Sequence, residues 1–220
     1  WRAVLNLGGI ANITLIPPLI GPDSSASVLG WDCGPANTLI DFAVQKITDG
    51  DLAFDRDGLI ALNGSPNEEI IVSWLKEPFF QKLPPKSTGR EKFGFVDMQE
   101  RFEATKNLSD EEFVATLTAF SAAVVAQDLD NLKFKNLVMP IELFVSGGGC
   151  RNPVMFNELA KRCRGVRVIS IEQIGIPIEA REAFVFALLA WWHSHQIQGN
   201  SPAITGAKRA VVLGSCVNPV

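Results

Sequence analysis

The chain of 220 residues lacks the features that mark several classes of protein. Basic residues do not outnumber acidic ones, and a net charge of −4 gives no basic surface for nucleic acid or anionic lipid. The four cysteines include no CxxC pair and have no histidine nearby, which excludes zinc-ligand spacing and a secreted disulfide scaffold. We therefore expect a cytoplasmic protein with no nucleic-acid partner.

Long apolar runs are also missing, and no leader peptide is expected. No run reaches the roughly 18 residues of a membrane span, and the apolar run 184–192 is much too short. Trp1 stands directly in a strand-like pattern, so a signal peptide is not expected. A membrane partner is therefore not expected, and a strand at the first residue suggests a fragment of a longer protein.

What the sequence contains is typical of a globular α/β domain. Apolar residues make up 47% and charged residues 20%, so a chain of this length can bury a sizeable core. The segments 49–64 and 83–95 are expected to be loops, and the apolar side chains of 184–192 are expected to be core. The remaining patterns predict strands over 4–7, 11–16, 27–31, 141–145 and 166–171, and helices over 37–47, 67–80, 109–129, 153–163 and 179–195.

Two turns rich in glycine and asparagine, at 6–14 and 30–37, interrupt the first strands. Such turns expose backbone N–H groups that can hold phosphate or sugar oxygens. Asp32 lies in the second turn, at the predicted junction of strand and helix. There its carboxylate could act as a general base, bind a metal ion or cap the helix behind it, and the residue types leave these roles open. Asp41, one turn into that helix, is expected to be a surface or capping group.

A second glycine run, SGGGCRN at 146–152, follows a buried strand and precedes a helix that starts at Pro153. It either brings the backbone close to a flat or anionic ligand or forms only a tight turn. It matches neither a Walker A loop nor a GxGxxG fingerprint, so the motif by itself does not identify a nucleotide site.

Several charged groups have both a functional and a purely structural interpretation. Lys86, Arg90 and Glu91 lie on a loop rich in Ser, Thr and Gly that suits a phosphate or a sugar carboxylate, but a solvated loop has the same composition. The acidic segment 55–58 is either functional or a turn that satisfies its own polar groups. Glu182 begins the last helix, where it either meets ligand hydroxyls or only favours the helix N-terminus.

Taken together and in order, these pieces resemble the anhydro-N-acetylmuramic acid kinase family, within the sugar kinase, Hsp70 and actin superfamily. Each motif is moderately specific, but their common order extends over nearly the whole chain. The matching segments are 6–14, 30–41, 55–58, 84–91, 146–152, 177–190 and 205–214.

The resemblance implies an α/β fold with a ribonuclease H-like mixed sheet flanked by helices, and a helical insertion over about 64–130. Members of this superfamily pair two such domains around a nucleotide cleft. The family begins with a GTSxDGxD-type phosphate loop and also carries a GGQGAPL-type segment, and neither occurs here. Residues 1–220 are therefore expected to form the second, C-terminal domain of an actin-like or sugar-kinase two-domain fold, without its N-terminal domain.

The resemblance also implies roles for individual residues. Asp32 takes the place of the catalytic acid, and no residue is implied as a metal ligand. The implied ATP or phosphate contacts are Asn6, Gly8, Gly9, Asn12, Gly147, Gly148, Gly149 and Asn152. The implied sugar contacts are Asn37, Lys86, Arg90, Glu91 and Glu182.

The implied reaction uses ATP with Mg²⁺ to open the 1,6-anhydro linkage of anhydro-N-acetylmuramic acid with water and to phosphorylate O6. It belongs to the recycling of peptidoglycan amino sugars. The implied partners are the anhydro-sugar, ATP and the missing N-terminal domain, and a homodimer is left open. The chain alone is expected to turn over poorly or not at all, because half of the cleft is absent.

Two departures and two alternatives accompany this resemblance. The family pattern at the acid reads DTGPGN, whereas this chain has DCGPAN, so Cys33 loses a hydroxyl and Ala36 adds a methyl group.

A chaperone-like or regulatory ATPase would keep the glycine run but need no sugar contacts. A silent scaffold domain would use Asp32 only as a cap. The segments 55–58 and 84–91 favour the kinase, because the alternatives give them no common purpose.

Overall fold

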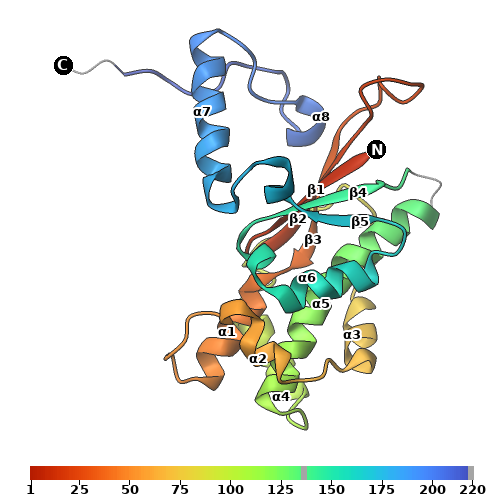
Figure 1. The fold of residues 1–220 in the computed structure, drawn as a ribbon, viewed down its shortest axis with the longest axis vertical. Helices are drawn as coiled ribbons and strands as arrows, with labels where there is room; N and C mark the ends of the chain where they lie inside the picture. Colours follow the sequence, from red (N-terminus) through yellow and green to blue (C-terminus); the bar gives the residue numbers. More distant parts are fainter. Residues whose placement is uncertain (135–137, 218–220) are drawn as a thin grey trace.

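Five strands form one mixed sheet at the centre of the molecule (Figure 1). The computed structural model describes residues 1–134 and 138–217. Across the sheet the order is β3-β2-β1-β4-β5, with β2 antiparallel to β1 and β3, β4 parallel to β1, and β5 parallel to β4. This topology confirms the predicted ribonuclease H-like α/β fold. The strands are β1 (Arg2–Leu7), β2 (Ile10–Ile16), β3 (Leu29–Pro35), β4 (Glu142–Ser146) and β5 (Arg167–Ser170).

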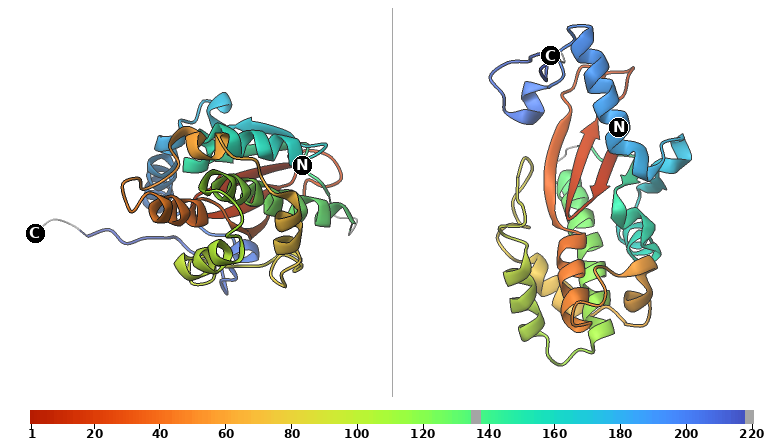
Figure 2. Two further views of the ribbon diagram at one scale, coloured as in Figure 1. Left: turned by 90° about the horizontal axis from the view of Figure 1, so that it is seen from below. Right: turned by 90° about the vertical axis from the view of Figure 1, so that its left-hand side faces the viewer.

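The helices flank this sheet and extend beyond it. Helices α1 to α4 lie at the opposite end of the molecule from α7 and α8 (Figures 1 and 2). The helices are α1 (Asn37–Ile47), α2 (Leu59–Leu62), α3 (Glu68–Leu75), α4 (Phe95–Ala104), α5 (Asp110–Phe134), α6 (Pro153–Arg162), α7 (Arg181–Ser194) and α8 (Pro202–Thr205).

One face of the first strands belongs to the core. Every second residue is buried, and Leu5, Leu7, Ala11 and Ile13 are each at most 1% exposed. Successive side chains of a strand point to opposite faces, so the residues between them lie on the other face of the sheet. Asn12 is one of these, and this face carries part of the site described below.

Helix α5 is the central helix of the core. Its Phe120 packs edge-on against Trp74 and Phe80, with ring centroids 5.1 and 5.3 Å apart. The helix begins at a capping box: Ser109 Oγ accepts from the Glu112 backbone N–H at 3.2 Å, and the Glu112 carboxylate accepts from the Ser109 N–H at 2.9 Å. The sequence therefore starts this helix and places its aromatic face in the core.

The same helix qualifies, by length and composition, as a membrane span over Asp110–Leu132. This corrects the expectation that no segment of the chain does so. However, 89% of its apolar window is buried inside the fold. A helix that is apolar all round and enclosed by protein is typical of a core, and α5 takes that place here.

Several predicted bounds differ from the structure. Strand β3 continues to Pro35, so Asp32 lies within the strand and not at its end. Helix α3 ends at Leu75 and not at residue 80, because Pro78 disfavours a helical conformation of the residue before it. The two segments expected to be loops contain α2 and the first residue of α4.

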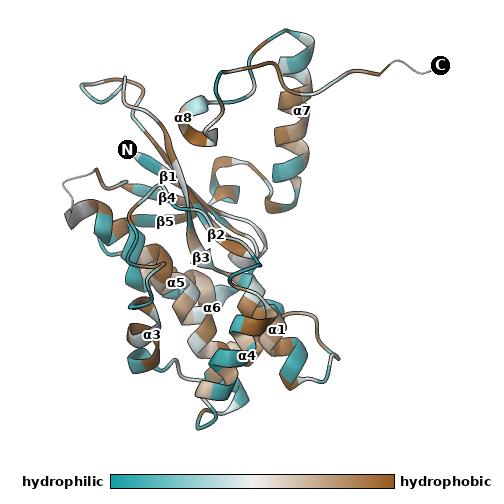
Figure 3. Cartoon of the chain, turned by 180° about the vertical axis from the view of Figure 1, so that it is seen from behind, coloured by the Kyte–Doolittle hydropathy of each residue, from teal (hydrophilic) through white to brown (hydrophobic). Residues whose placement is uncertain are grey.

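The core predicted over 184–192 is wrong. No residue of α7 is buried, and Phe184, Phe186 and Trp191 are 61%, 67% and 51% exposed. In Figure 3 the helix is coloured mostly brown and tan although it stands clear of the sheet. An apolar pattern shows that a helix needs a partner, but it does not show whether that partner lies within the described residues.

Candidate active site

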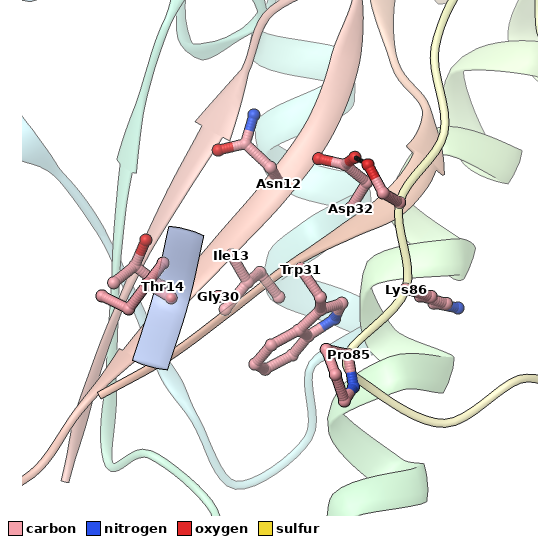
Figure 4. A pocket seen from close by; sticks show the side chains of 10 residues that line it. Asn12, Ile13, Thr14, Gly30, Trp31, Asp32, Pro85 and Lys86 are labelled. Atoms are coloured by element: carbon pink, nitrogen blue, oxygen red, sulfur yellow. Dashed lines mark hydrogen bonds between the residues drawn. The ribbon is translucent and has the colours of Figure 1, made fainter. Parts of the chain in front are cut away.

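Asp32 lies on β3 directly opposite Asn12 of β2. Opposed residues of neighbouring strands point to the same face, and both side chains line one pocket of about 410 Å³ (Figure 4). The half-buried carboxylate lies beside the segment 85–87, which borders the pocket together with Ile204 of α8. The sheet therefore brings two of the predicted site residues, 20 positions apart in the sequence, to one place.

The Asp32 carboxylate is held by the loop that follows α3. Its Oδ2 accepts from Ser87 Oγ at 2.8 Å and from the Thr88 backbone N–H at 3.0 Å. Its own backbone N–H donates to the Lys86 carbonyl at 3.0 Å. Asp32 is therefore not a helix cap, because its carboxylate bonds to a different segment of the chain.

The N-terminus of α1 is closed by the turn between β1 and β2. The backbone N–H groups of Asn37 and Thr38 donate to the carbonyls of Gly8 and Gly9, each at 3.1 Å. The Asn37 side chain adds two bonds from Nδ2, to Leu7 O at 3.0 Å and to Gly8 O at 2.9 Å. The amide N–H groups of Asn37 therefore fasten the turn to α1, and its expected contact with the sugar stays a prediction.

Lys86 needs a correction. Its Nζ forms an ion pair with Asp128 Oδ1 at 2.7 Å, and the two side chains are only 3% and 1% exposed. Trp31 Nε1 donates to the other oxygen of Asp128 at 3.0 Å. Burial raises the pKa of Asp128, while the neighbouring Lys86 acts to lower it. In Figure 4 the Lys86 side chain points away from Asp32, so its ammonium is not available to a sugar in the pocket.

In the glycine run after β4, two glycines are packed closely against β1 and one faces open space. Gly147 has φ +86°, and a Cβ there would lie 2.6 Å from Asn6 Oδ1 and 2.7 Å from Leu7 O. A Cβ on Gly149 would lie 2.9 Å from the Leu7 side chain. Around Gly148 a Cβ would meet nothing within 4 Å. Asn6 and the outer glycines therefore pack the run against β1, and Gly148 faces open space.

Gly148 lines a second pocket, of about 710 Å³. This pocket lies between the first turns of α1, the segment 53–57 and the glycine run. It contains Asn152 from the predicted set, whose Oδ1 accepts from the N–H groups of Val154 and Met155 and so caps α6. Its other lining residues include Asn37, Asp41, Phe54, Arg56 and Arg151.

Asp41 lines this pocket, although the sequence assigned it only to the surface or to a helix cap. Burial raises its pKa from 3.8 to about 6, while Arg90 acts to lower it. The Arg90 guanidinium also lies against the turn of β1 and β2, since a Cβ on Gly9 would be 3.3 Å from it. The signal was present, because Asp41 follows Asn37 by four residues and such residues share one face of a helix.

Glu91 and Glu182 line neither pocket, whereas Asp55 lies at the larger one with its carboxylate bonded to α2. Glu91 is exposed, and the Glu182 side chain is 81% exposed on α7 beside Arg181. Asp55 is 5% exposed, and its carboxylate accepts from the N–H groups of Ile60 and Ala61 in α2. The structural interpretation of the 55–58 segment therefore holds for Asp55.

Comparison with known proteins identifies the family. The sequence model described as anhydro-N-acetylmuramic acid kinase matches residues 1–219. The chain belongs to this family. Two relatives of that name, from Prochlorococcus marinus strains MIT 9313 and MIT 9303, are 63% and 64% identical over 219 residues. These matches cover 100% of this chain and 58% of each relative, so the chain spans less than two thirds of their length.

Among solved structures, gluconate kinase from Lactobacillus acidophilus is similar with a TM-score of 0.49 and 17% identity, over 77% of this chain and 35% of that one.

The two departures from the anhydro-N-acetylmuramic acid kinase pattern both lie in the core. Cys33 and Ala36 are 0% exposed. Burial, with the nearby Asp128 as the next cause, raises the pKa of the Cys33 thiol well above its usual value. Cys33 follows Asp32 in β3 and therefore points to the opposite face of the sheet, away from the pocket. The lost hydroxyl and the added methyl group thus change the packing behind the site.

Proposed function

We propose that the protein carrying this chain is an ATP-dependent kinase of 1,6-anhydro-N-acetylmuramic acid, which yields N-acetylmuramic acid 6-phosphate and ADP in the cytoplasm. Membership of the family supports the reaction. The observation that carries the role of Asp32 is its carboxylate, which lines a pocket with Oδ2 held by two donors of one loop. The family match favours this function over a chaperone-like ATPase and over a scaffold domain.

The two pockets divide the substrates between them. The pocket of Asp32 and Asn12 takes the anhydro-sugar, and the larger pocket beside Gly148 and Asn152 takes the nucleotide. The turn at Gly8 and Gly9 closes the start of α1 next to the larger pocket, and Arg90 lies against this turn. The Arg90 cation at that point suits the phosphoryl group that passes from one substrate to the other.

Asp32 has a defined part in the proposed reaction. It accepts a proton from a water molecule whose oxygen bonds to the anomeric carbon, as the base does in an inverting glycosidase. The bond between the anomeric carbon and O6 breaks, and its electron pair stays on O6. O6 then bonds to the γ-phosphorus of ATP while the bond to ADP breaks. Phosphoryl transfer to O6 replaces protonation, so a second carboxylic acid is not needed.

Mg²⁺ would accompany ATP and neutralise charge on its phosphates. In the part of the chain that the structure describes, no group of three or more His, Cys, Asp or Glu side chains could hold a metal ion. Mg²⁺ needs no such group, because it is commonly bound by phosphate oxygens and water with only one or two protein carboxylates. Asp41, at the nucleotide pocket, is a carboxylate that could face such an ion or its water shell.

We further propose that residues 1–220 form the C-terminal domain of a two-domain kinase, with 64–130 as a helical segment added to it. The relatives' greater length supports a further domain, and the apolar side chains of α7 supply a surface for it to cover. The isolated chain is then expected to turn over poorly, because the cleft needs both domains. A homodimer would be a separate interaction.

The role of Asp32 is tested by the Asp32→Asn substitution in the full-length protein, with formation of ADP and the 6-phosphate as the assay. Asparagine keeps the shape and still accepts from Ser87 and Thr88, but it cannot take the proton. We expect turnover to fall about 10²- to 10⁴-fold, which is the usual contribution of a general base. Asp51→Asn, at an exposed position outside both pockets, is the matched control.

Near-normal turnover by the Asp32→Asn protein would remove Asp32 as the base. Vigorous turnover by the purified 220-residue chain would contradict the two-domain proposal without touching the role of Asp32. The two outcomes are therefore read separately.

A further inference from the structure

The ion pair of Lys86 and Asp128 stands directly behind the strand that carries Asp32. Both side chains are almost completely buried, and the pair is completed by the Trp31 indole N–H, which donates to Asp128 at 3.0 Å. Moving two charges out of water is costly, and apolar side chains of similar volume often stabilise a core equally well. The presence of a buried ion pair at this position is therefore better explained by the segment that it holds in place than by a contribution to the stability of the fold.

What it fixes is the loop segment on the edge of the sheet. Strand β3 is an edge strand, and residues 86–88 run beside it without forming a strand of their own. Three successive residues of this segment bond to Asp32: Lys86 through its carbonyl, Ser87 through its hydroxyl and Thr88 through its backbone N–H. The segment is anchored to the core by the side chain of Lys86, which ends on α5.

We propose that the ion pair of Lys86 and Asp128 is a positioning device that holds Ser87 and Thr88 against the Asp32 carboxylate. The two donors occupy Oδ2 and fix the plane of the carboxylate, which leaves Oδ1 for the attacking water. The charged groups of Lys86 and Asp128 pair with each other in the core and act only through the loop. This inference rests on the proposed function of Asp32 as the base.

The test uses the full-length protein with the pair replaced together, as Lys86→Met and Asp128→Asn. Methionine keeps an unbranched apolar stem, and asparagine keeps an acceptor for Trp31, so no unpaired charge remains in the core. We expect the melting temperature of this double variant to exceed that of the single Lys86→Met variant. We nevertheless expect its kcat to stay about 10- to 100-fold below that of the unaltered protein, with KM for ATP unchanged, because a small displacement at the reacting group has effects of this size.

A kinetic cycle with Ser87→Ala shows whether the pair acts through this loop. In the unaltered background the loss of the Ser87 hydroxyl is expected to lower kcat roughly tenfold, since hydrogen bonds to charged groups are the stronger ones. In the background of the double variant it should cause no further loss, because the hydroxyl has already moved. Lys92→Met is the matched control: Lys92 lies over the same Phe79 ring as Lys86, at 4.7 Å against 4.9 Å, but does not reach Asp128.

Three results would overturn the inference. One is a double variant whose kcat recovers together with its melting temperature, which is the behaviour of a purely structural pair. Another is a full, additive loss from Ser87→Ala in the double variant. The third is a crystal structure of the doubly substituted chain that retains the Ser87 bond to Asp32 near 2.8 Å. Full activity of Asp32→Asn would instead overturn the proposed base, and this inference with it.

Discussion

Replacement of Asp41 by asparagine is expected to stabilise the isolated chain at neutral pH and to have little effect at pH 4. Burial raises the pKa of this carboxyl from 3.8 to about 6. The folded state therefore binds the proton more tightly than the unfolded state does. Stability that depends on this proton is present below pH 3.8 and is lost as the pH rises through 6, so the ionised carboxylate destabilises the fold at pH 7.5.

The magnitude follows from the shift, which is about 6 − 3.8, or roughly two units. At about 1.4 kcal/mol per unit this corresponds to about 3 kcal/mol, which we reduce to about 1–2 kcal/mol because the side chain is only half-buried and water screens its charge. For a chain of this length that gain raises the melting temperature by about 2–8 °C. At pH 4 about a fifth of the gain should remain.

The assay is thermal unfolding of the unaltered, Asp41→Asn and Asp51→Asn chains, followed by circular dichroism from pH 4 to pH 8. Asp51 is exposed and serves as the matched control. The reasoning predicts a difference that grows between pH 4 and pH 6 for Asp41→Asn only. An equal gain at every pH would refute it, and so would a lower melting temperature at pH 7.5, since Arg90 would then outweigh burial.

The remaining predictions concern the glycine run and the larger pocket. Gly147→Ala should lower the free energy of unfolding by about 2–4 kcal/mol, because φ is +86° and the new Cβ would meet Leu7 O at 2.7 Å. Gly148→Ala should change the free energy of unfolding by less than about 0.5 kcal/mol. Urea unfolding of the two variant chains compares these effects, and equal effects would contradict the packing described. Phe54→Ala should weaken ATP binding by the full-length protein roughly three- to tenfold, measured by calorimetry, and should leave stability unchanged. The reason is that Phe54 is an aromatic side chain, 50% exposed, in the proposed nucleotide pocket. Unchanged affinity for ATP would place the nucleotide elsewhere.

The order of strands and helices could be read from the sequence because each element carries its own local signals. Helix α1 has the predicted bounds, and the capping box at Ser109 starts α5 within one residue of the prediction. The ends were less certain where two signals compete, as at α3, whose apolar pattern continues past the point at which Pro78 stops the helix. The exposed α7 shows the limit of such patterns, because its apolar sequence did not reveal that none of its residues is buried among the described residues.

The candidate site was predictable as a set of segments but not as a set of roles. Lys86 and Arg90 are both cations of one loop, and composition treats them alike. In the fold the ammonium of Lys86 is buried against Asp128, 42 residues away, while Arg90 stays exposed beside Gly9. Asn37 likewise has the residue type of a ligand contact, but its donors are taken by two carbonyls of β1 and the following turn.

The sequence by itself determined the family and the α/β class, and it predicted the acid at position 32, since these depend on residue types in a fixed order. Only the tertiary structure decided that Asp32 is a strand residue held by a loop and not a helix cap. It also separated the site residues into two pockets and added Asp41 to the larger one. The reason is physical: a side chain's role depends on burial and on partners brought from distant parts of the chain, and neither is encoded in its neighbours along the sequence.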